Sequence, residues 1–266
     1  MKRLLLPLIL AAIIALSGCG SAAAAPQPLR SVPWEDGEEL IYDVYHRGEI
    51  VGEVSYSFGI TDINIELLDD DEYQYQNIIS RHTEKDIDEV LENMLLLNPN
   101  TLQTAASFCQ YSGNESQWVV TTIYENDYML VASFNYEDEK KTADKAESFK
   151  LPETYPHDDG NSETLPQFLR LFPKPAEPYT LCLGQPGNFN KSGPMYQICR
   201  VSYYKTREMI WNGQPVRAYG IRVGPAGSMR QPSTTYWYSD DETRTLLQTD
   251  QGQVSYVLQG VDWIFR

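Results

Sequence analysis

Ile50–Ile60, IVGEVSYSFGI, alternates between two kinds of position. Every second residue from Ile50 to Ile60 is apolar or glycine, whereas the positions between them include Glu53, Ser55 and Ser57. A period of two over this length predicts an antiparallel strand with one solvated face. Gly37–Tyr45 precedes it across a turn at Arg47-Gly48-Glu49, so the two segments predict a β-hairpin.

The same pattern recurs along the chain. Trp118–Tyr124 and Tyr128–Phe134 alternate on either side of Glu125-Asn126-Asp127 and predict a second hairpin. Further strands are expected near Tyr179–Leu183, Met195–Thr206, Gln214–Val223, Thr234–Tyr238, Thr243–Thr249 and Val254–Leu258. Many short strands at this spacing predict an all-β fold, an antiparallel β-barrel or strongly curved half-barrel with one or two short helices.

Two segments have helical spacing. Leu165, Phe168, Leu169 and Phe172 lie at i, i+3, i+4 and i+7; Thr164 is expected to cap this helix and Pro173 to end it. We expect it to cover one side or end of the sheet. Ile87–Leu95 also predicts a helix, with a strand beginning at Leu95 as the alternative. The mostly charged segment Glu137–Lys150 predicts a solvated loop or a frayed helix.

The N-terminus resembles a bacterial lipoprotein signal. Leu4–Leu16 is an apolar run of about 13 residues, within the roughly 7–15 of a signal-peptide core and short of the ~20 that span a bilayer. Leu16-Ser17-Gly18-Cys19 resembles a lipobox, which implies acylation (palmitate or a similar chain) at Cys19; an ordinary secretory cleavage near Ala22–Ala25 is the alternative. We therefore expect a signal peptide at 1–18, a flexible lipidated tether at 19–33 and one β-barrel-like domain at 34–266.

Charge and length limit the partners. The chain has 266 residues and a formal net charge of −16. An acidic surface opposes nucleic-acid binding, which depends on neutralising phosphates. It also disfavours adhesion to anionic lipid heads, so the expected contact with the membrane is the covalent anchor. The expected location is the extracytoplasmic side of the cell membrane or outer membrane.

Three cysteines follow Cys19. Cys182 and Cys199 flank the segment Gly184–Pro194 and are a possible disulfide in an exported protein. The alternative is two buried free thiols on neighbouring strands. Cys109 would be left unpaired in the first case.

No catalytic constellation is visible. His46, His82 and His157 are widely spaced, and neither a His-Glu-x-x-His motif nor a Gly-x-Ser-x-Gly elbow occurs. Three acidic clusters, at Asp69–Glu72, His157–Gly160 and Asp240–Glu242, are interpreted as solvated turns rather than metal or carboxylate sites. We therefore expect no catalytic residues, no metal and no cofactor.

Two segments resemble a bacterial envelope family, the domain of unknown function DUF3108. The first is Gly37-Glu38 with Leu40, Tyr42 and Val44, followed by Gly48 and Gly52-Glu53. The second is Trp237-Tyr238-Ser239-Asp240-Asp241 followed by Arg244, although the proline common after that arginine is absent. The resemblance implies an antiparallel barrel or half-barrel in the cell envelope and carries no known activity.

These observations lead to two hypotheses about function. The first is a lipid-anchored, non-catalytic barrel that binds an apolar ligand or an envelope protein, with Tyr42, Tyr56, Phe58 and Trp237 as possible interior aromatics. Those aromatics could equally fill a solid core. The second is a hydrolase of envelope polymers that uses two carboxylates facing each other across a cleft, for which the acidic excess is the only support.

Overall fold

The computed structural model describes residues 23–24, 31–63, 73–113, 117–125, 128–137, 140–152, 157–158, 163–185, 194–227 and 233–262. The strands are β1 Ala23–Ala24, β2 Glu39–His46, β3 Glu49–Ile63, β4 Tyr73–Glu84, β5 Val90–Leu97, β6 Thr104–Ser112, β7 Gln117–Glu125, β8 Tyr128–Glu137, β9 Lys140–Lys150, β10 His157–Asp158, β11 Tyr179–Gly184, β12 Tyr196–Trp211, β13 Gln214–Pro225, β14 Thr234–Ser239, β15 Leu246–Gln251 and β16 Val254–Leu258. The helices in these ranges are α2, Leu165–Phe168, and the 3-10 turn η1, Leu169–Leu171.

All strands belong to one sheet whose order is β1-β11-β12-β13-β14-β15-β16-β2-β3-β4-β5-β6-β7-β8-β9. Two antiparallel meanders, β2–β9 and β11–β16, are joined by the pairing of β16 with β2, while the two-residue strands β1 and β10 pair in parallel with β11. The sheet does not close, because β9 and β11 are not paired to each other. The predicted fold class, an all-β half-barrel with a short helix, is confirmed.

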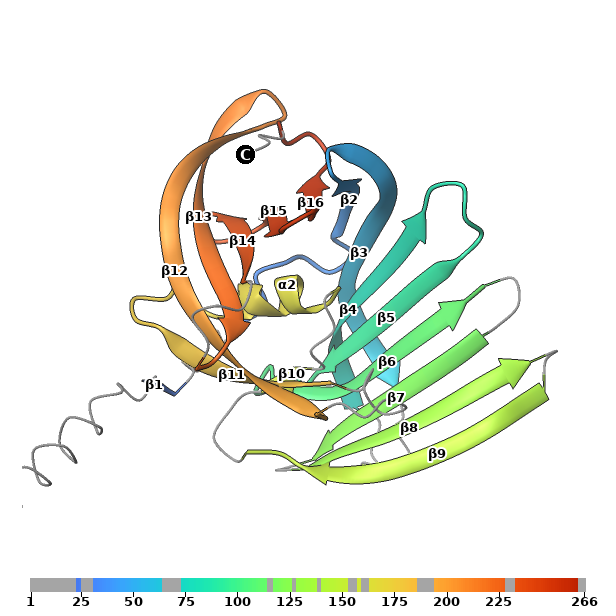
Figure 1. Cartoon of the computed structure of the whole chain (residues 1–266). Coiled ribbons are helices and arrows are strands. Elements are labelled where there is room, and N and C mark those ends of the chain that lie inside the picture. Colours follow the sequence, from blue (N-terminus) through green and yellow to red (C-terminus); the bar gives the residue numbers. More distant parts are fainter. Residues whose placement is uncertain are drawn as a thin grey trace, which may run out of the picture.

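The sheet has two parts of different shape (Figure 1). In the barrel half, which we define as β11–β16 with β2 and β3, the strands curve around α2. In the wing, defined as β4–β9, the strands continue as a broader sheet that extends away from the helix. The two hairpins expected from alternation are β2–β3 in the barrel half and β7–β8 in the wing.

Tight turns fix the register of the long hairpins. At Arg47-Gly48 and at Asn212-Gly213 both central residues have positive φ, of 52° and 94° and of 51° and 72°. This is the geometry of a two-residue hairpin turn whose twist matches that of the flanking strands, and asparagine and glycine adopt it readily. The tight turn expected at Asn212-Gly213 is therefore present.

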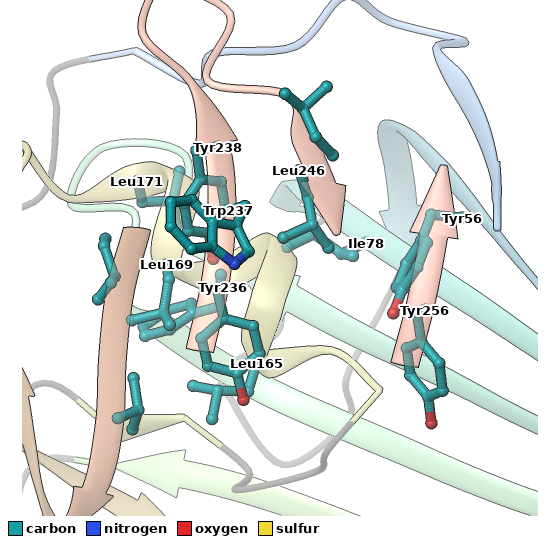
Figure 2. Packing of buried hydrophobic residues seen from close by; sticks show 14 of the residues in the cluster. Tyr56, Ile78, Leu165, Leu169, Leu171, Tyr236, Trp237, Tyr238, Leu246 and Tyr256 are labelled. Atoms are coloured by element: carbon teal, nitrogen blue, oxygen red, sulfur yellow. The ribbon is translucent and has the colours of Figure 1, made fainter. Parts of the chain in front are cut away.

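The main core lies mostly inside the barrel half and extends to β4 and β5 of the wing. Its members include Tyr42, Tyr56 and Phe58 from the first hairpin together with the apolar stripe of the helix. Figure 2 shows Leu165, Leu169 and Leu171 packed among Tyr236, Tyr238 and Leu246. The helix predicted over Leu165–Phe172 is confirmed, although Thr164 makes no side-chain hydrogen bond as its N-cap.

Two predictions of local structure are wrong. The segment expected to be a helix over Ile87–Leu95 contains β5, in which Leu95 and Leu97 belong to the main core while Leu96 belongs to a cluster on the other face. A strand buried on both faces has consecutive apolar residues, so its pattern is easily mistaken for helical spacing. The segment Glu137–Lys150, expected to be a loop or frayed helix, contains β9 (Lys140–Lys150), whose charged residues suit the free edge of a sheet.

Smaller clusters hold the wing. One joins Val120, Met129 and Val131 of the wing to Cys182 of β11, and the other packs Leu96, Ala106 and Ile123 on the opposite face. Within the described ranges, no helix has both the length and the apolar composition that crossing a bilayer requires.

Candidate functional site

A buried carboxylate lies at the junction of the barrel half and the wing. Glu163 lies just before the N-cap residue of α2, Thr164, and is 4% exposed. Its Oε1 accepts a hydrogen bond of 2.9 Å from the Tyr256 hydroxyl and lies 3.4 Å from His82 Nδ1. Its backbone carbonyl accepts a 2.6 Å hydrogen bond from the Tyr56 hydroxyl. These four residues, the Glu163 cluster, come from the loop before the helix and from three different strands; Figure 2 shows the two tyrosines side by side.

The electrostatics of the Glu163 cluster favour the protonated forms of His82 and Tyr56. The hydrogen bond with Glu163 raises the pKa of His82, while partial burial of the imidazole acts in the opposite direction. Burial, and then the nearby Glu163 charge, raises the pKa of Tyr56 well above its usual value, so this phenol remains a donor. A carboxylate that orients an imidazole is one part of an acid–base site. The His82 side chain contacts Glu163 and the Tyr256 ring, and no serine, threonine or cysteine is among these contacts.

A second buried polar group sits beside the helix. The guanidinium of Arg170 is fully buried, where it donates to Glu38 Oε1 at 3.1 Å and to the Thr243 carbonyl at 2.9 Å. It also lies over the rings of Trp34 and Phe58, at 5.5 Å and 5.1 Å from their centroids. Arg170 therefore ties the helix to residues 33–38 and to the β14–β15 turn, and its role is structural.

Two hollows are present on the described surface. One, of about 310 Å³, lies where β5 turns into β6 and is lined by Tyr75, Tyr124 and the turn residues Asn98–Ala105 except Leu102. The other, of about 410 Å³, lies on the outer face of β2–β5, where Ser55 and Ser57 leave space between Glu39, Glu53 and Glu92. Of the predicted interior aromatics, Tyr56 contributes to the second hollow, and Tyr42, Phe58 and Trp237 line neither.

The predicted interior aromatics fall into two groups. Tyr42, Tyr56 and Phe58 are buried inside the barrel half, where Tyr42 and Tyr56 make an edge-to-face contact with ring centroids 5.3 Å apart. Trp237 is buried too, but alternation places it on the opposite face of β14 from Tyr236 and Tyr238. There its Nε1 donates to Asp250 Oδ2 at 3.1 Å, and the Arg207 guanidinium covers its ring at 3.7 Å. Trp237 nevertheless belongs to the same buried core cluster as the other three aromatics, and their role in lining a ligand-binding interior stays a prediction.

The disulfide between Cys182 and Cys199 is not formed in this structure, which has both as free thiols. The register explains this: Cys182 is opposite Ile198 and Cys199 is opposite Leu181, so the two side chains point to opposite faces of the sheet. Burial raises the pKa of Cys182 to about 12 and that of Cys199 to about 11, which keeps both protonated and unreactive. This arrangement corresponds to the alternative of two buried thiols on neighbouring strands.

The acidic clusters differ in how far the structure describes them. Asp240 and Asp241 lie in the β14–β15 turn, as expected: Asp241 Oδ1 accepts hydrogen bonds from Ser239 and Thr243, and Asp240 pairs with Lys174 and Arg217. The backbone of His157-Asp158 forms β10. Asp159-Gly160, Asp69–Glu72 and Cys19 lie outside the described residues. Among the described residues, no three His, Cys, Asp or Glu side chains form a group that could hold a metal ion.

Sequence reasoning missed Glu163, His82 and Arg170. Arg170 interrupts the run Phe168–Phe172 in the apolar stripe, which was the available signal that a charge is buried there. Nothing local indicates that His82 and Glu163 meet, because 80 residues of chain and several strands separate them.

No protein-family model and no curated protein matches the sequence. Among solved structures, the chain is similar to a β-barrel-like protein of domain of unknown function DUF1849 from Brucella abortus, with 9% identity, a TM-score of 0.46 and coverage of 84% of this chain and 96% of that one. It is also similar to a candidate lipoprotein from Parabacteroides distasonis (11% identity, TM-score 0.31, coverage of 89% and 100%). A candidate exported protein with a YmcC-like fold from Bacteroides fragilis has 11% identity, a TM-score of 0.31 and coverage of 91% and 100%. Likenesses of this size carry no functional information.

Proposed function

We propose that this chain is a lipid-anchored protein of the bacterial cell envelope that acts as a non-catalytic binding scaffold. The observation that carries the proposal is the packing of the barrel half. Its interior is occupied by α2 and by tyrosines whose hydroxyls bond to the backbone around that helix: Tyr56 to Glu163 and Tyr238 to Pro166. A barrel packed in this way supports a scaffold for an envelope partner better than a carrier of an apolar ligand.

The docking of the N-terminal segment supports the same function. Trp34 is buried against Phe58, with ring centroids 4.9 Å apart, and the Pro33 carbonyl accepts a hydrogen bond from Arg170. The tether proposed for residues 19–33 would thus end on the barrel half. Ala23 and Ala24 of the tether pair with β11, which also belongs to the barrel half, and this leaves the wing as the part available to a partner.

The alternative hydrolase finds little support. It requires two carboxylates facing each other across a cleft. Within the described residues Glu163 is the one buried carboxylate, and its side-chain partners are an imidazole and a phenol. Glu39, Glu53 and Glu92 line the hollow on the outer face of β2–β5, but all three are exposed.

We also propose that this chain is a member of the DUF3108 family. The residues that carry the resemblance form the β2–β3 hairpin, strand β14 and its acidic turn, and Arg244 donates a hydrogen bond to the Phe172 carbonyl just after the helix. The proposed membership would be contradicted by a solved DUF3108 structure in which the equivalent arginine makes no contact with a helix of this kind.

Two experiments test the proposal. Mass spectrometry of the mature protein should find an acylated Cys19 at its N-terminus, and Cys19→Ser should release the protein from the membrane fraction; an unmodified terminus would contradict the anchor. For the wing, a photo-crosslinking amino acid at exposed Tyr128 should capture an envelope component in cells, whereas the same group at exposed Tyr203 in the barrel half should not. Equal crosslinking from both positions, or a lipid that copurifies in native mass spectrometry, would overturn the scaffold.

A further inference from the structure

The hollow at the β5–β6 turn is uncharged in a strongly acidic protein. The chain has a net charge of −16, yet the described residues that line this hollow are two tyrosines, a proline, an alanine, and amide and hydroxyl side chains. A charged ligand would find no compensating charge among them. The hollow measures about 310 Å³, near the lower end of the roughly 300–1,000 Å³ typical of small-molecule sites.

The turn is rigid and its backbone donors are already used. Asn98 Oδ1 accepts hydrogen bonds from the N–H groups of Asn100 and Thr101, at 2.9 Å and 3.1 Å. The N–H of Leu102 donates to the Asn98 carbonyl and that of Asn98 donates to the Gln103 carbonyl. The Leu102 side chain is buried in the main core and pins the turn to it. A peptide that bound by adding a strand would need free backbone groups, and this turn does not offer these donors.

The side chains of the turn remain available. Asn100, Thr101 and Gln103 are exposed, and within the described residues the side-chain amides of Asn100 and Gln103 make no hydrogen bond. Each amide carries donors and an acceptor side by side. Tyr75 and Tyr124 are almost fully buried, so their rings form a fixed part of the wall. A tyrosine ring offers an apolar face.

We propose that this hollow, the turn pocket, binds an uncharged sugar unit of an envelope carbohydrate. A sugar presents neighbouring hydroxyls, each of which donates and accepts, together with an apolar C–H face. The amides of Asn100 and Gln103 match the hydroxyls, and Pro99 and Ala105, with the accessible parts of the two tyrosines behind them, match the C–H face. The pocket opens at the exposed turn, so it fits one unit of a longer chain. The inference deepens the proposed function, because it gives the wing a ligand class.

The test uses the mature lipoprotein in detergent and saturation-transfer NMR with a panel of neutral mono- and disaccharides, including glucose, galactose and N-acetylglucosamine. Glucuronate serves as the charged probe and a neutral dipeptide as the peptide probe. We expect saturable binding of at least one neutral sugar at millimolar concentration and weaker binding of glucuronate. Asn100→Ala and Gln103→Ala should each weaken the binding of that sugar by roughly tenfold, because each removes hydrogen bonds to it.

Gln214→Ala removes an exposed amide at the far β12–β13 turn and should leave sugar binding unchanged. Both pocket substitutions are at exposed positions, and their melting temperatures should match that of the wild type. The inference is overturned if no neutral sugar binds, if neither pocket substitution changes the affinity, or if the dipeptide binds more tightly than every sugar. Each of these results would leave the anchoring and crosslinking experiments unaffected, so the two proposals fail separately.

Discussion

The barrel half and the wing are made of the same antiparallel meander, yet they bury their residues by different means. In the barrel half the sheet curves around α2, and the tyrosines that point inward combine ring packing with hydrogen bonds to the helix region. In the wing no helix lies among the described elements; Ile78, Leu95 and Leu97 reach the main core, and two small clusters supply the rest of the hydrophobic burial. The comparison teaches that alternation of apolar and polar residues is enough to form a strand. A solid core inside a curved sheet also requires a helix that packs against its inner face.

The largest expected effect tests the role of the helix in that difference. Phe168→Ala removes a fully buried ring from α2 and should lower the free energy of unfolding by about 4 kcal/mol. Phe108→Ala removes a half-buried ring from the wing and should cost about half as much. Chemical denaturation of both variants measures the difference; equal losses would mean that the two parts are equally packed.

Arg170→Ala tests whether the barrel half depends on its buried charge. The substitution leaves Glu38 and the Thr243 carbonyl without their cationic donor, and we expect a loss of about 3 kcal/mol in the free energy of unfolding. Protease cleavage near Trp34 should also accelerate, since Arg170 holds that segment. The exposed Arg81 of the wing is the matched control, and Arg81→Ala should stay within about 0.5 kcal/mol of the wild type.

Tyr238→Phe sharpens the comparison at the level of one hydroxyl. It removes the 2.7 Å hydrogen bond to the Pro166 carbonyl and should destabilise the protein by about 1 kcal/mol with no change in packing. Tyr128→Phe, in the wing, removes a hydroxyl from a side chain that is 48% exposed and should have no measurable effect. If Tyr238→Phe left the free energy of unfolding unchanged, the helix would be held by packing alone.

The smallest effect is a dependence on pH at the junction of the two parts. Because Glu163 raises the pKa of His82, the stabilisation from this pair is fully present below the ordinary histidine pKa of about 6.5. It is lost as the pH rises through the raised value. The free energy of unfolding, measured across this range, should therefore fall with increasing pH in the wild type. His82→Gln should remove this component, whereas His46→Gln, at an exposed position, should retain it.

Much of the fold could be predicted because strands and turns are local. The period of two in Ile50–Ile60 and the turn residues Asn212-Gly213 carry their structure in their own chemistry. Prediction failed at β5 and β9, for opposite reasons. Leu95–Leu97 is apolar on both faces because β5 is covered on both, and Lys140–Lys150 is charged because β9 is a free edge. Burial on both faces and a free edge both depend on which elements pack against the strand or pair with it in the folded sheet.

The candidate site was less accessible to prediction than the fold. The amides of the turn pocket lie within a few residues of each other, but Tyr75 and Tyr124 reach the pocket only through the pairing of β4 to β7. The Glu163 cluster likewise combines residues from β3, β4 and β16 with the start of the helix.

The sequence by itself determined that this chain is a meander of short strands with one amphipathic helix, because the side-chain period and the turn residues act over a few residues. Tertiary structure alone decided that β16 pairs with β2, that both faces of β14 are buried, with Trp237 on one and Tyr236 and Tyr238 on the other, and that Glu163 meets His82. The physical reason is that sheet curvature and strand order set which faces become enclosed, and these are properties of the whole sheet rather than of any one strand.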